Sequence, residues 1–355
     1  MLPYYLLVFI PFSVYMLGLY KGKNYNRLCI SIFFLILLLL LSMRSVNTGI
    51  DLKNYKYFFN SISNLSLHES LNYSEKGEPL FYLLNKVISI ISNNNFQVFL
   101  TVVAIISILP IYLFYYNKSD NALLTIALFL TVAPFTIFFS GLRQSIAIGI
   151  IVFSFKYIEN NKIIKFIIYL LIAFFFHRSA IFCLPLYLVY HIKINKNSLY
   201  IIIPLMILIF LFNQQIFTAI LSFTTLYDGK IEITGAYSIL ILLILFAIYC
   251  FSFPSNEKID SDFIGLRNIL LFSIIIQMFA PIHPTIMRVN YYYLLFIPIL
   301  ISKTIKVSNI NLLKILNVSY VIMTIFFIFY FFYTGYTGDD ILHIFPYIPF
   351  WEVKC

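Results

Sequence analysis

The sequence is dominated by long apolar runs that alternate with short polar connectors. As α-helices, such runs are long enough to cross about 30 Å of hydrocarbon. The chain is 61% hydrophobic and only 11% charged, whereas soluble domains carry roughly 25% charged residues. We therefore predict an all-α, polytopic integral membrane protein with one transmembrane domain over residues 1–355 and spans near 2–20, 28–43, 96–116, 122–140, 143–158, 163–176, 179–192, 198–214, 236–253, 263–281, 288–302 and 312–334.

Two apolar segments need a separate interpretation. Residues 2–20 have no basic segment ahead of them and no small-residue cleavage pattern, which indicates a retained span rather than a signal peptide. The segment 79–92 is short and at best amphipathic, so we interpret it as a re-entrant or interfacial helix. The prediction is thus about 12 transmembrane helices plus this helix. If 79–92 crosses the membrane, there are 13 spans and the two ends of the chain face opposite sides.

The distribution of lysine sets the expected orientation. With Lys23 and Arg27 in the cytoplasm, most lysines fall in short cytoplasmic connectors, including the cluster at 156–165. The net charge of +10 is then explained by basic residues that orient the chain in the membrane, and it does not indicate nucleic-acid binding. Two long stretches, 44–95 and 335–355, are expected to lie outside.

These two external stretches carry different patterns. An interfacial helix is predicted in 44–95 by six apolar residues that recur at helical spacing, namely Leu52, Tyr55, Phe58, Phe59, Ile62 and Leu65. Thr48 followed by Asp51 resembles a start signal for that helix. The tail at 335–355 contains FPYIPFW, whose prolines and aromatic residues predict an ordered interfacial strap rather than a helix.

Arginine concentrates on the side where lysine is scarce. Orientation signals use both residues alike, so topology does not explain this, and arginine is the residue suited to bidentate phosphate binding. Arg143 opens a predicted helix, where the dipole disfavours a structural cation but helps to bind an anion. The structural alternatives are snorkelling at span ends and, near the last site, a rigid two-proline turn. The candidates for binding an anionic substrate, a phosphate or a carboxylate, are Arg44, Arg143, Arg178 and Arg288.

Two residues are candidates for acid–base catalysis. Asp51 follows Arg44 in the external stretch, with a helix N-cap as its structural alternative. His177 interrupts two short apolar runs, where a plain turn would favour Gly, Asn or Pro. The reserve candidates, whose alternative is helix capping, are Glu75, Glu78 and Gln144.

No metal or cofactor is expected. His177 has no further ligands at helical spacing. The four cysteines are scattered and mostly lie in apolar runs, so they indicate neither a disulfide framework nor a metal site.

The ordered motifs of the first 200 residues are similar to those of one family. The chain resembles the EpsG family, a branch of the Wzy-type polysaccharide polymerases, in Arg44…Thr48-Gly-Ile-Asp51…Tyr55, Glu78-Pro-Leu-Phe81, Leu142-Arg143-Gln144-Ser-Ile-Ala147 and Phe176-His177-Arg-Ser179-Ala180. Arg178 departs from the pattern, because a smaller residue is expected after the histidine. The fold expected on this interpretation is a helical bundle, with a GT-C-like arrangement as one form.

The resemblance implies a glycosyltransferase of the bacterial inner membrane that acts in O-antigen (lipopolysaccharide), capsule or exopolysaccharide synthesis. Such enzymes join undecaprenyl-pyrophosphate-linked oligosaccharides on the outer, periplasmic face, without nucleotide sugar or ATP. Membrane lipids, a chain-length regulator and a flippase are the expected partners. The alternatives are a flippase or transporter of the lipid-linked oligosaccharide, a membrane acyltransferase and a non-catalytic subunit. Charges at one face and the lack of an internal repeat favour the polymerase over a transporter.

Overall fold

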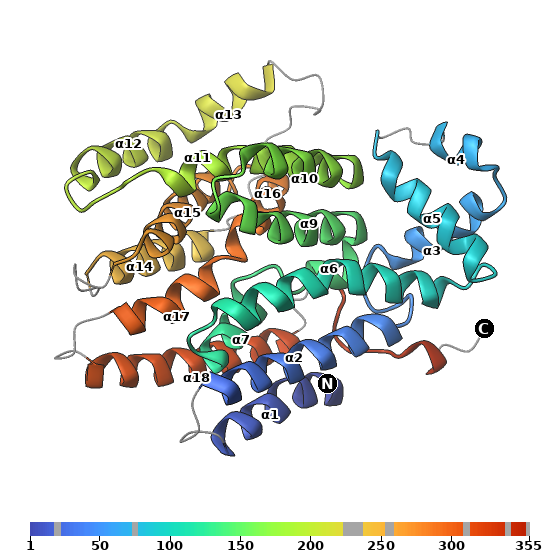
Figure 1. The fold of residues 1–355 in the computed structure, drawn as a ribbon, viewed down its shortest axis with the longest axis horizontal. Helices are drawn as coiled ribbons and strands as arrows, with labels where there is room; N and C mark the ends of the chain where they lie inside the picture. Colours follow the sequence, from blue (N-terminus) through green and yellow to red (C-terminus); the bar gives the residue numbers. More distant parts are fainter. Residues whose placement is uncertain are drawn as a thin grey trace. The chain divides into compact units, whose positions relative to one another are not determined.

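The computed structural model describes residues 1–17, 23–72, 77–222, 237–252, 259–307, 313–337 and 342–352. In these ranges every regular element is a helix, and the only extended pairing is an isolated bridge between Arg44 and Pro349 (Figure 1). The all-α prediction is therefore confirmed. The chain divides into two compact units, residues 1–184 with 319–355 and residues 185–318. That the whole chain is one transmembrane domain stays a prediction.

The larger unit is built on a row of long helices. Neighbours in this row pack in the order α1, α2, α6, α9 and α10. Asn95 starts α6 by accepting hydrogen bonds from two backbone N–H groups of its first turn. Gly149 lets α9 approach α6 closely, because a Cβ there would lie 2.8 Å from the carbonyl oxygen of Ile106. The bounds are α1 Leu2–Leu17, α2 Lys23–Met43, α6 Phe96–Lys118, α9 Leu142–Glu159 and α10 Ile163–Phe176, with α7 Ala122–Thr131, α8 Ile137–Ser140 and the 3-10 helix η1 Arg178–Cys183 between or after them.

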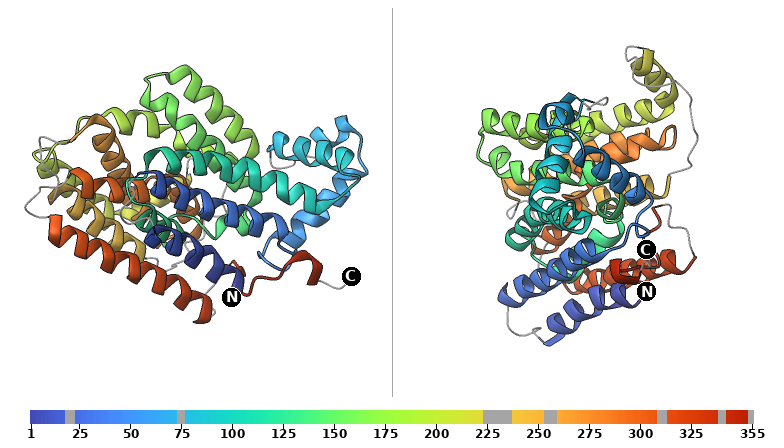
Figure 2. Two further views of the ribbon diagram at one scale, coloured as in Figure 1. Left: turned by 60° about the horizontal axis from the view of Figure 1, so that its bottom comes forward. Right: turned by 90° about the vertical axis from the view of Figure 1, so that its right-hand side faces the viewer.

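A group of short helices fills the stretch 44–95. It consists of α3 (Leu52–Ser63), α4 (Leu67–Asn72) and α5 (Pro79–Ile91), which lie together at one end of α6 (Figures 1 and 2). The predicted amphipathic helix is confirmed as α3, whose buried side includes Tyr55 and Phe59. An external, interfacial or re-entrant position for these helices stays a prediction.

The expected start signal of α3 works differently. Asp51 stands at the N-cap, but its side chain makes no capping hydrogen bond. The hydroxyl of Thr48 donates to the carbonyl oxygen of Ile348 at 3.1 Å and accepts from the Ile348 N–H at 2.9 Å. The predicted start of α3 after Asp51 is confirmed, but the capping hydrogen bonds are not made, because both side chains are used in contacts distant in sequence.

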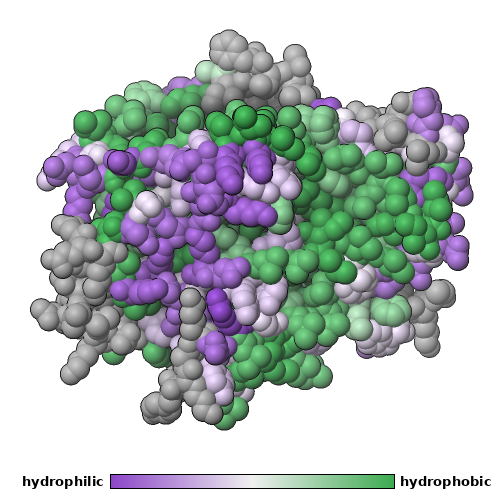
Figure 3. All heavy atoms as spheres, in the orientation of Figure 1, coloured by the Kyte–Doolittle hydropathy of each residue, from purple (hydrophilic) through white to green (hydrophobic). Residues whose placement is uncertain are grey.

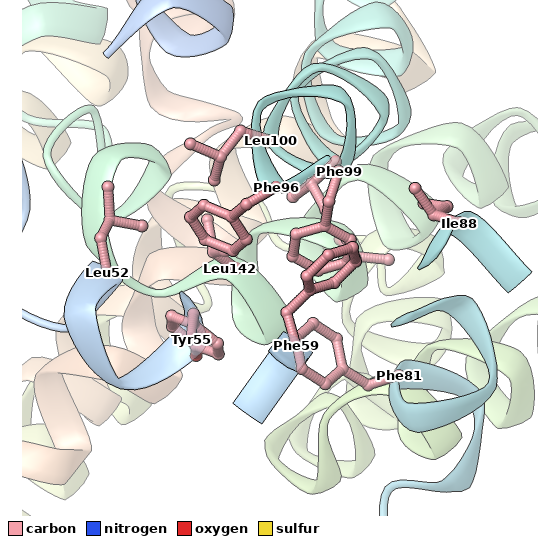
Figure 4. Packing of buried hydrophobic residues seen from close by; sticks show 11 residues of the cluster. Leu52, Tyr55, Phe59, Phe81, Ile88, Phe96, Phe99, Leu100 and Leu142 are labelled. Atoms are coloured by element: carbon pink, nitrogen blue, oxygen red, sulfur yellow. The ribbon is translucent and has the colours of Figure 1, made fainter. Parts of the chain in front are cut away.

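One apolar cluster joins α3, α5, α6 and α9. Figure 4 shows its eleven residues, among them Phe59 and Phe99, whose ring centroids are 5.2 Å apart, and Tyr55 and Phe81 at 5.6 Å. Burial of each large apolar side chain contributes roughly 1.5–3 kcal/mol. The cluster therefore fixes the start of α9 against α3 and α5, which matters for the polar residues described below.

The C-terminal segment 342–352 forms the predicted strap. It is irregular until the 3-10 turn η4 (Phe350–Glu352) and lies along the loop that follows α2. Backbone N–H groups of Ser45, Gly49 and Ile50 donate to its carbonyl groups at 2.8–2.9 Å. Gly49 has a φ of +119°, and a Cβ there would lie 2.3 Å from the Phe139 carbonyl oxygen, so this loop requires glycine. The strap is thus ordered by the protein itself.

The second unit is centred on α15, which packs against α11, α14, α16 and α17. Asn290 of α16 is fully buried and bonds to the hydroxyl of Ser273 and to Oε1 of Gln277 on α15. A satisfied polar network of this kind fixes how two apolar helices pack. The bounds are α11 Pro185–His191, α12 Leu199–Leu211, α13 Asn213–Ser222, α14 Tyr237–Ser252, α15 Ser261–Gln277, α16 Pro284–Leu294 and α17 Ile297–Val307.

Helix length and surface composition are those of a membrane protein. Three helices of the described chain are long and apolar enough to cross a membrane, namely Asn24–Met43, Phe96–Lys118 and Val318–Thr337 of α18 (Leu313–Thr337). Two bent pairs, α12 with α13 at 73° and α16 with α17 at 40°, raise this number to five if each pair is one span. Large apolar side chains are exposed along α10, α12 and α18, and Figure 3 shows broad apolar areas on one face.

Several expected spans are shorter than the pattern suggests. The run 122–140 is divided into α7 and α8, because Pro134 between them lacks an N–H for a continuous helix. The run 179–192 is η1 followed by α11, which starts at Pro185. The 12-span count and the GT-C-like arrangement stay predictions.

Candidate functional site

The carboxylate of Glu78 holds two of the predicted site residues. Nη1 of Arg143 lies 2.7 Å from Oε2, and Nδ1 of His177 lies 2.8 Å from Oε1. The side chain of Glu78 is only 5% exposed, while those of Arg143 and His177 are 18% and 28% exposed. We call these three residues the Glu78 cluster. It is a buried anion flanked by two nitrogen groups that remain partly accessible.

Three helix ends bring the Glu78 cluster together. Glu78 is the N-cap of α5 and is followed by Pro79, a residue suited to the first turn of a helix. Gly141 separates α8 from α9, so that Arg143 stands in the first turn of α9. His177 ends α10 in an extended conformation. Because α5 packs against α10, and α9 packs against α10, these ends converge.

The local charges keep Glu78 ionised. Burial by itself raises the pKa of the Glu78 carboxyl. The hydrogen bond and charge of His177, together with the charge of Arg143, outweigh burial and lower that pKa to about 2. At neutral pH the carboxylate can therefore only accept hydrogen bonds. The Arg143 guanidinium also lies 5.6 Å from the ring centre of Tyr55 and 5.5 Å from that of Phe81.

Glu78 should stabilise the protein at neutral pH and lose this effect in acid. Its pKa is about 2 in the folded chain against an ordinary value of 4.5, so the unfolded chain takes up the proton first as the pH falls. The contribution, about 3 kcal/mol at roughly 1.36 kcal/mol per unit, is complete above about pH 5 and decreases toward pH 2. Thermal unfolding in detergent should show the stability gap between wild type and Glu78→Gln narrowing from pH 6 to pH 3. Glu352→Gln at an exposed site is the control, and a gap that does not change with pH would contradict the prediction.

Arg178 lies beside the same carboxylate. Its backbone N–H donates to Oε1 of Glu78 at 3.3 Å. Its guanidinium covers Gly77, where a Cβ would lie 2.0 Å from Nη2, and Gly77 has a φ of +65°. The backbone therefore favours glycine before Glu78, and the guanidinium of Arg178 packs over it. Arg178 is exposed, so a second guanidinium stands at the rim of the Glu78 cluster.

Asp51 makes a different contact. Its Oδ2 accepts from the hydroxyl of Ser140 at 3.0 Å, and its backbone N–H donates to the same hydroxyl at 3.3 Å. The pair joins the start of α3 to the end of α8, three residues before Arg143. Asp51 therefore links α3 to α8 shortly before the start of α9, and its hydrogen bonds are to Ser140.

The remaining candidates lie elsewhere. Arg44 is 1% exposed; it donates from Nη1 to the carbonyl oxygen of Leu41 and lies 5.7 Å from the Phe139 ring. Gln144 is buried on α9. Arg288 is exposed on α16 in the second unit, so its proximity to the other arginines stays a prediction.

Sequence reasoning underestimated Glu78. It was a reserve candidate, yet the structure gives it the central position; the available signal was a glutamate between Gly77 and Pro79 ahead of an apolar run. The contributions of Tyr55 and Ser140 were not anticipated. Glu75 lies outside the described residues. Within the described ranges, His, Cys, Asp and Glu form no group of three that could hold a metal ion.

Comparison with known proteins gives one match. The model of a single family, described as the EpsG family, matches residues 27–348. Neither curated proteins nor solved structures give a significant match. The matched range includes every residue of the Glu78 cluster as well as Arg44, Asp51 and Arg288.

Proposed function

Because the chain belongs to the EpsG family of polysaccharide polymerases, we propose that it joins undecaprenyl-pyrophosphate-linked oligosaccharide repeat units by glycosyl transfer. The reaction takes place on the outer face of the bacterial inner membrane, where the lipid-linked units are presented. The product is an O-antigen, capsular or extracellular polysaccharide. The family supports polymerase activity in general, and the donor and the membrane face are the specific parts of the proposal.

The observation that carries the proposal is the position of Arg143. Its guanidinium is bonded to Glu78 through Nη1 and packs against two neighbouring aromatic rings, so it is held in place before substrate arrives. Further N–H groups remain for phosphate oxygens. The N-terminus of α9 adds a favourable potential for an anion at the same place.

The chemistry follows from the charges. A hydroxyl of the acceptor unit attacks the anomeric carbon of the donor sugar, and the lipid pyrophosphate leaves with the bonding electrons. Arg143, with Arg178 at the rim, stabilises the negative charge that develops on the leaving group. Arg44 and Arg288 are further candidates for contact with the pyrophosphate. Asp51 and His177 are candidates for accepting the hydroxyl proton.

A membrane acyltransferase is the second candidate function. Such an enzyme needs a histidine with a polar partner to activate a hydroxyl, and His177 with Glu78 provides this arrangement. It would attach an acyl group to the polysaccharide and would not lengthen it. The cationic rim formed by Arg143 and Arg178 favours the polymerase, because a pyrophosphate leaving group requires it and an acyl donor does not.

A strain lacking the gene provides both the test and the substrate. We expect lipid-linked single repeat units to accumulate on the outer face of its inner membrane. These units, extracted and added to the purified protein in liposomes, should be converted into a ladder of longer chains. Units trapped on the inner face of the deletion strain would point to a flippase, and full-length polymer lacking an ester would point to an acyltransferase; either result would overturn the proposal.

A further inference from the structure

We propose that His177 accepts the proton of the acceptor hydroxyl at Nε2 and that Glu78 positions its imidazole for this role. The inference rests on the proposed function and deepens it. It assigns the proton acceptor, which the sequence leaves open between Asp51 and His177, and it gives Glu78 a role in the reaction.

The contact with Glu78 determines which ring nitrogen of His177 carries the hydrogen. Nδ1 lies 2.8 Å from Oε1 of Glu78, a distance at which one of the two atoms must donate a hydrogen. An ionised carboxylate has no hydrogen to give, so Nδ1 carries it, and when the ring is neutral the lone pair is on Nε2. Among the residues that the structure describes, none bonds to Nε2. The side chain of His177 is 28% exposed, so a substrate hydroxyl can approach it.

The carboxylate of Glu78 also fixes the imidazole of His177 relative to the guanidinium of Arg143. One oxygen of Glu78 holds His177 and the other holds Arg143. The proton acceptor and the cation for the leaving group are therefore fixed relative to each other by a single side chain that is 5% exposed. A bisubstrate transfer requires such a fixed separation, since hydroxyl and pyrophosphate lie on opposite sides of the anomeric carbon.

Asp51 is less suited to accept the proton. One of its carboxylate oxygens is bonded to the hydroxyl of Ser140, which also accepts the backbone N–H of Asp51. These hydrogen bonds give Asp51 a structural role, because they link the start of α3 to the end of α8.

The proposed transfer forms one bond at the anomeric carbon and breaks another. The acceptor oxygen forms a bond to the anomeric carbon while its proton moves to Nε2 of His177, giving an imidazolium. The bond from the anomeric carbon to the pyrophosphate oxygen breaks, and that oxygen keeps the electron pair. Glu78 stabilises the imidazolium through Nδ1–H. The proton passes to water before the next cycle.

Chemical rescue tests the role of His177. Polymerisation by purified His177→Ala in liposomes, with lipid-linked units from the deletion strain as substrate, should be slower by about 100-fold or more. Added imidazole should raise the polymerisation rate of His177→Ala at least tenfold, because a free base can occupy the vacated space. His68→Ala, at an exposed histidine on α4, is the matched control and should polymerise like wild type with or without imidazole.

A double-variant cycle tests the role of Glu78. Glu78→Gln should lower kcat at least tenfold in the wild-type background and at least threefold less than that in the His177→Ala background, because the part of its effect that acts through His177 is absent there while the part that acts through Arg143 remains. If Glu78 only supports the fold or Arg143, the loss is equal in both backgrounds, and the positioning role is wrong. If His177→Ala polymerises within threefold of wild type, His177 is not the proton acceptor. The same conclusion follows if the variant is folded but imidazole does not restore its activity. A wild-type protein that forms no polymer instead refutes the proposed function, so the two failures are distinguishable.

Discussion

Replacing Arg143 with alanine should lower polymer formation by at least 100-fold. Arg143 is the cation that the structure holds most firmly in the Glu78 cluster, and loss of one group that stabilises developing charge costs about 10²–10³ in rate. Single repeat units should accumulate on their lipid while the variant remains in the membrane. The measurement is the length distribution of polysaccharide in a deletion strain that carries the variant, together with the amount of protein in its membranes.

The variant also leaves Glu78 as a buried carboxylate without its arginine. Breaking a buried pair in this way costs about 3–5 kcal/mol, so Arg143→Ala can lose activity by losing structure. Glu78→Gln combined with Arg143→Ala removes the buried charge and should recover the protein level but not the polymer. Arg143→Lys should retain a cation with weaker activity, because an ammonium lacks the planar fork of N–H groups. Lys56→Ala, at an exposed lysine of α3, is the matched loss of a positive charge. Polymer of normal length from Arg143→Ala would contradict the proposed role of Arg143 in stabilising the leaving pyrophosphate.

Ending the chain at residue 341 should destabilise the protein and stop polymerisation. The strap at 342–352 accepts hydrogen bonds from Ser45, Gly49 and Ile50, and its Ile348 exchanges two hydrogen bonds with Thr48. At a net value of about 1 kcal/mol for each bond, the loss amounts to several kcal/mol. The loop that it holds leads directly into Asp51 and α3. We expect a lower unfolding temperature in detergent and at least a tenfold fall in polymer.

The control for this truncation ends at Glu352. It keeps every strap contact described above and should behave like the full chain. The variant Thr48→Val tests the mechanism at one residue: it keeps the shape of the side chain but removes the two hydroxyl hydrogen bonds, and it should lower the unfolding temperature by less than the truncation does. A truncation at 341 that unfolds at the wild-type temperature would show that the strap only lies on the surface.

Local pattern was sufficient for much of the fold. The spacing of Leu52, Tyr55 and Phe59 predicted α3, and the prolines and aromatic residues of the tail predicted a strap rather than a helix. Both features follow from the period of apolar residues or from the geometry of proline, which act over a few neighbours. The expected spans at 122–140 and 179–192 were continued through Pro134 and Pro185, where hydropathy remains high although α7 ends before Pro134 and α11 starts at Pro185.

The sequence by itself determined that this protein is helical, that it belongs in a membrane, and that Arg143 and His177 are costly polar residues that need a reason. Only the tertiary structure decided that Glu78 is their common partner. Glu78 is 65 residues from Arg143 and 99 from His177, and no periodicity connects positions so distant. Their meeting depends on the packing of α3, α5, α6 and α9 through one apolar cluster. Tertiary packing likewise buried Arg44 beside the strap, which pairs with it at Pro349, about 300 residues further along the chain.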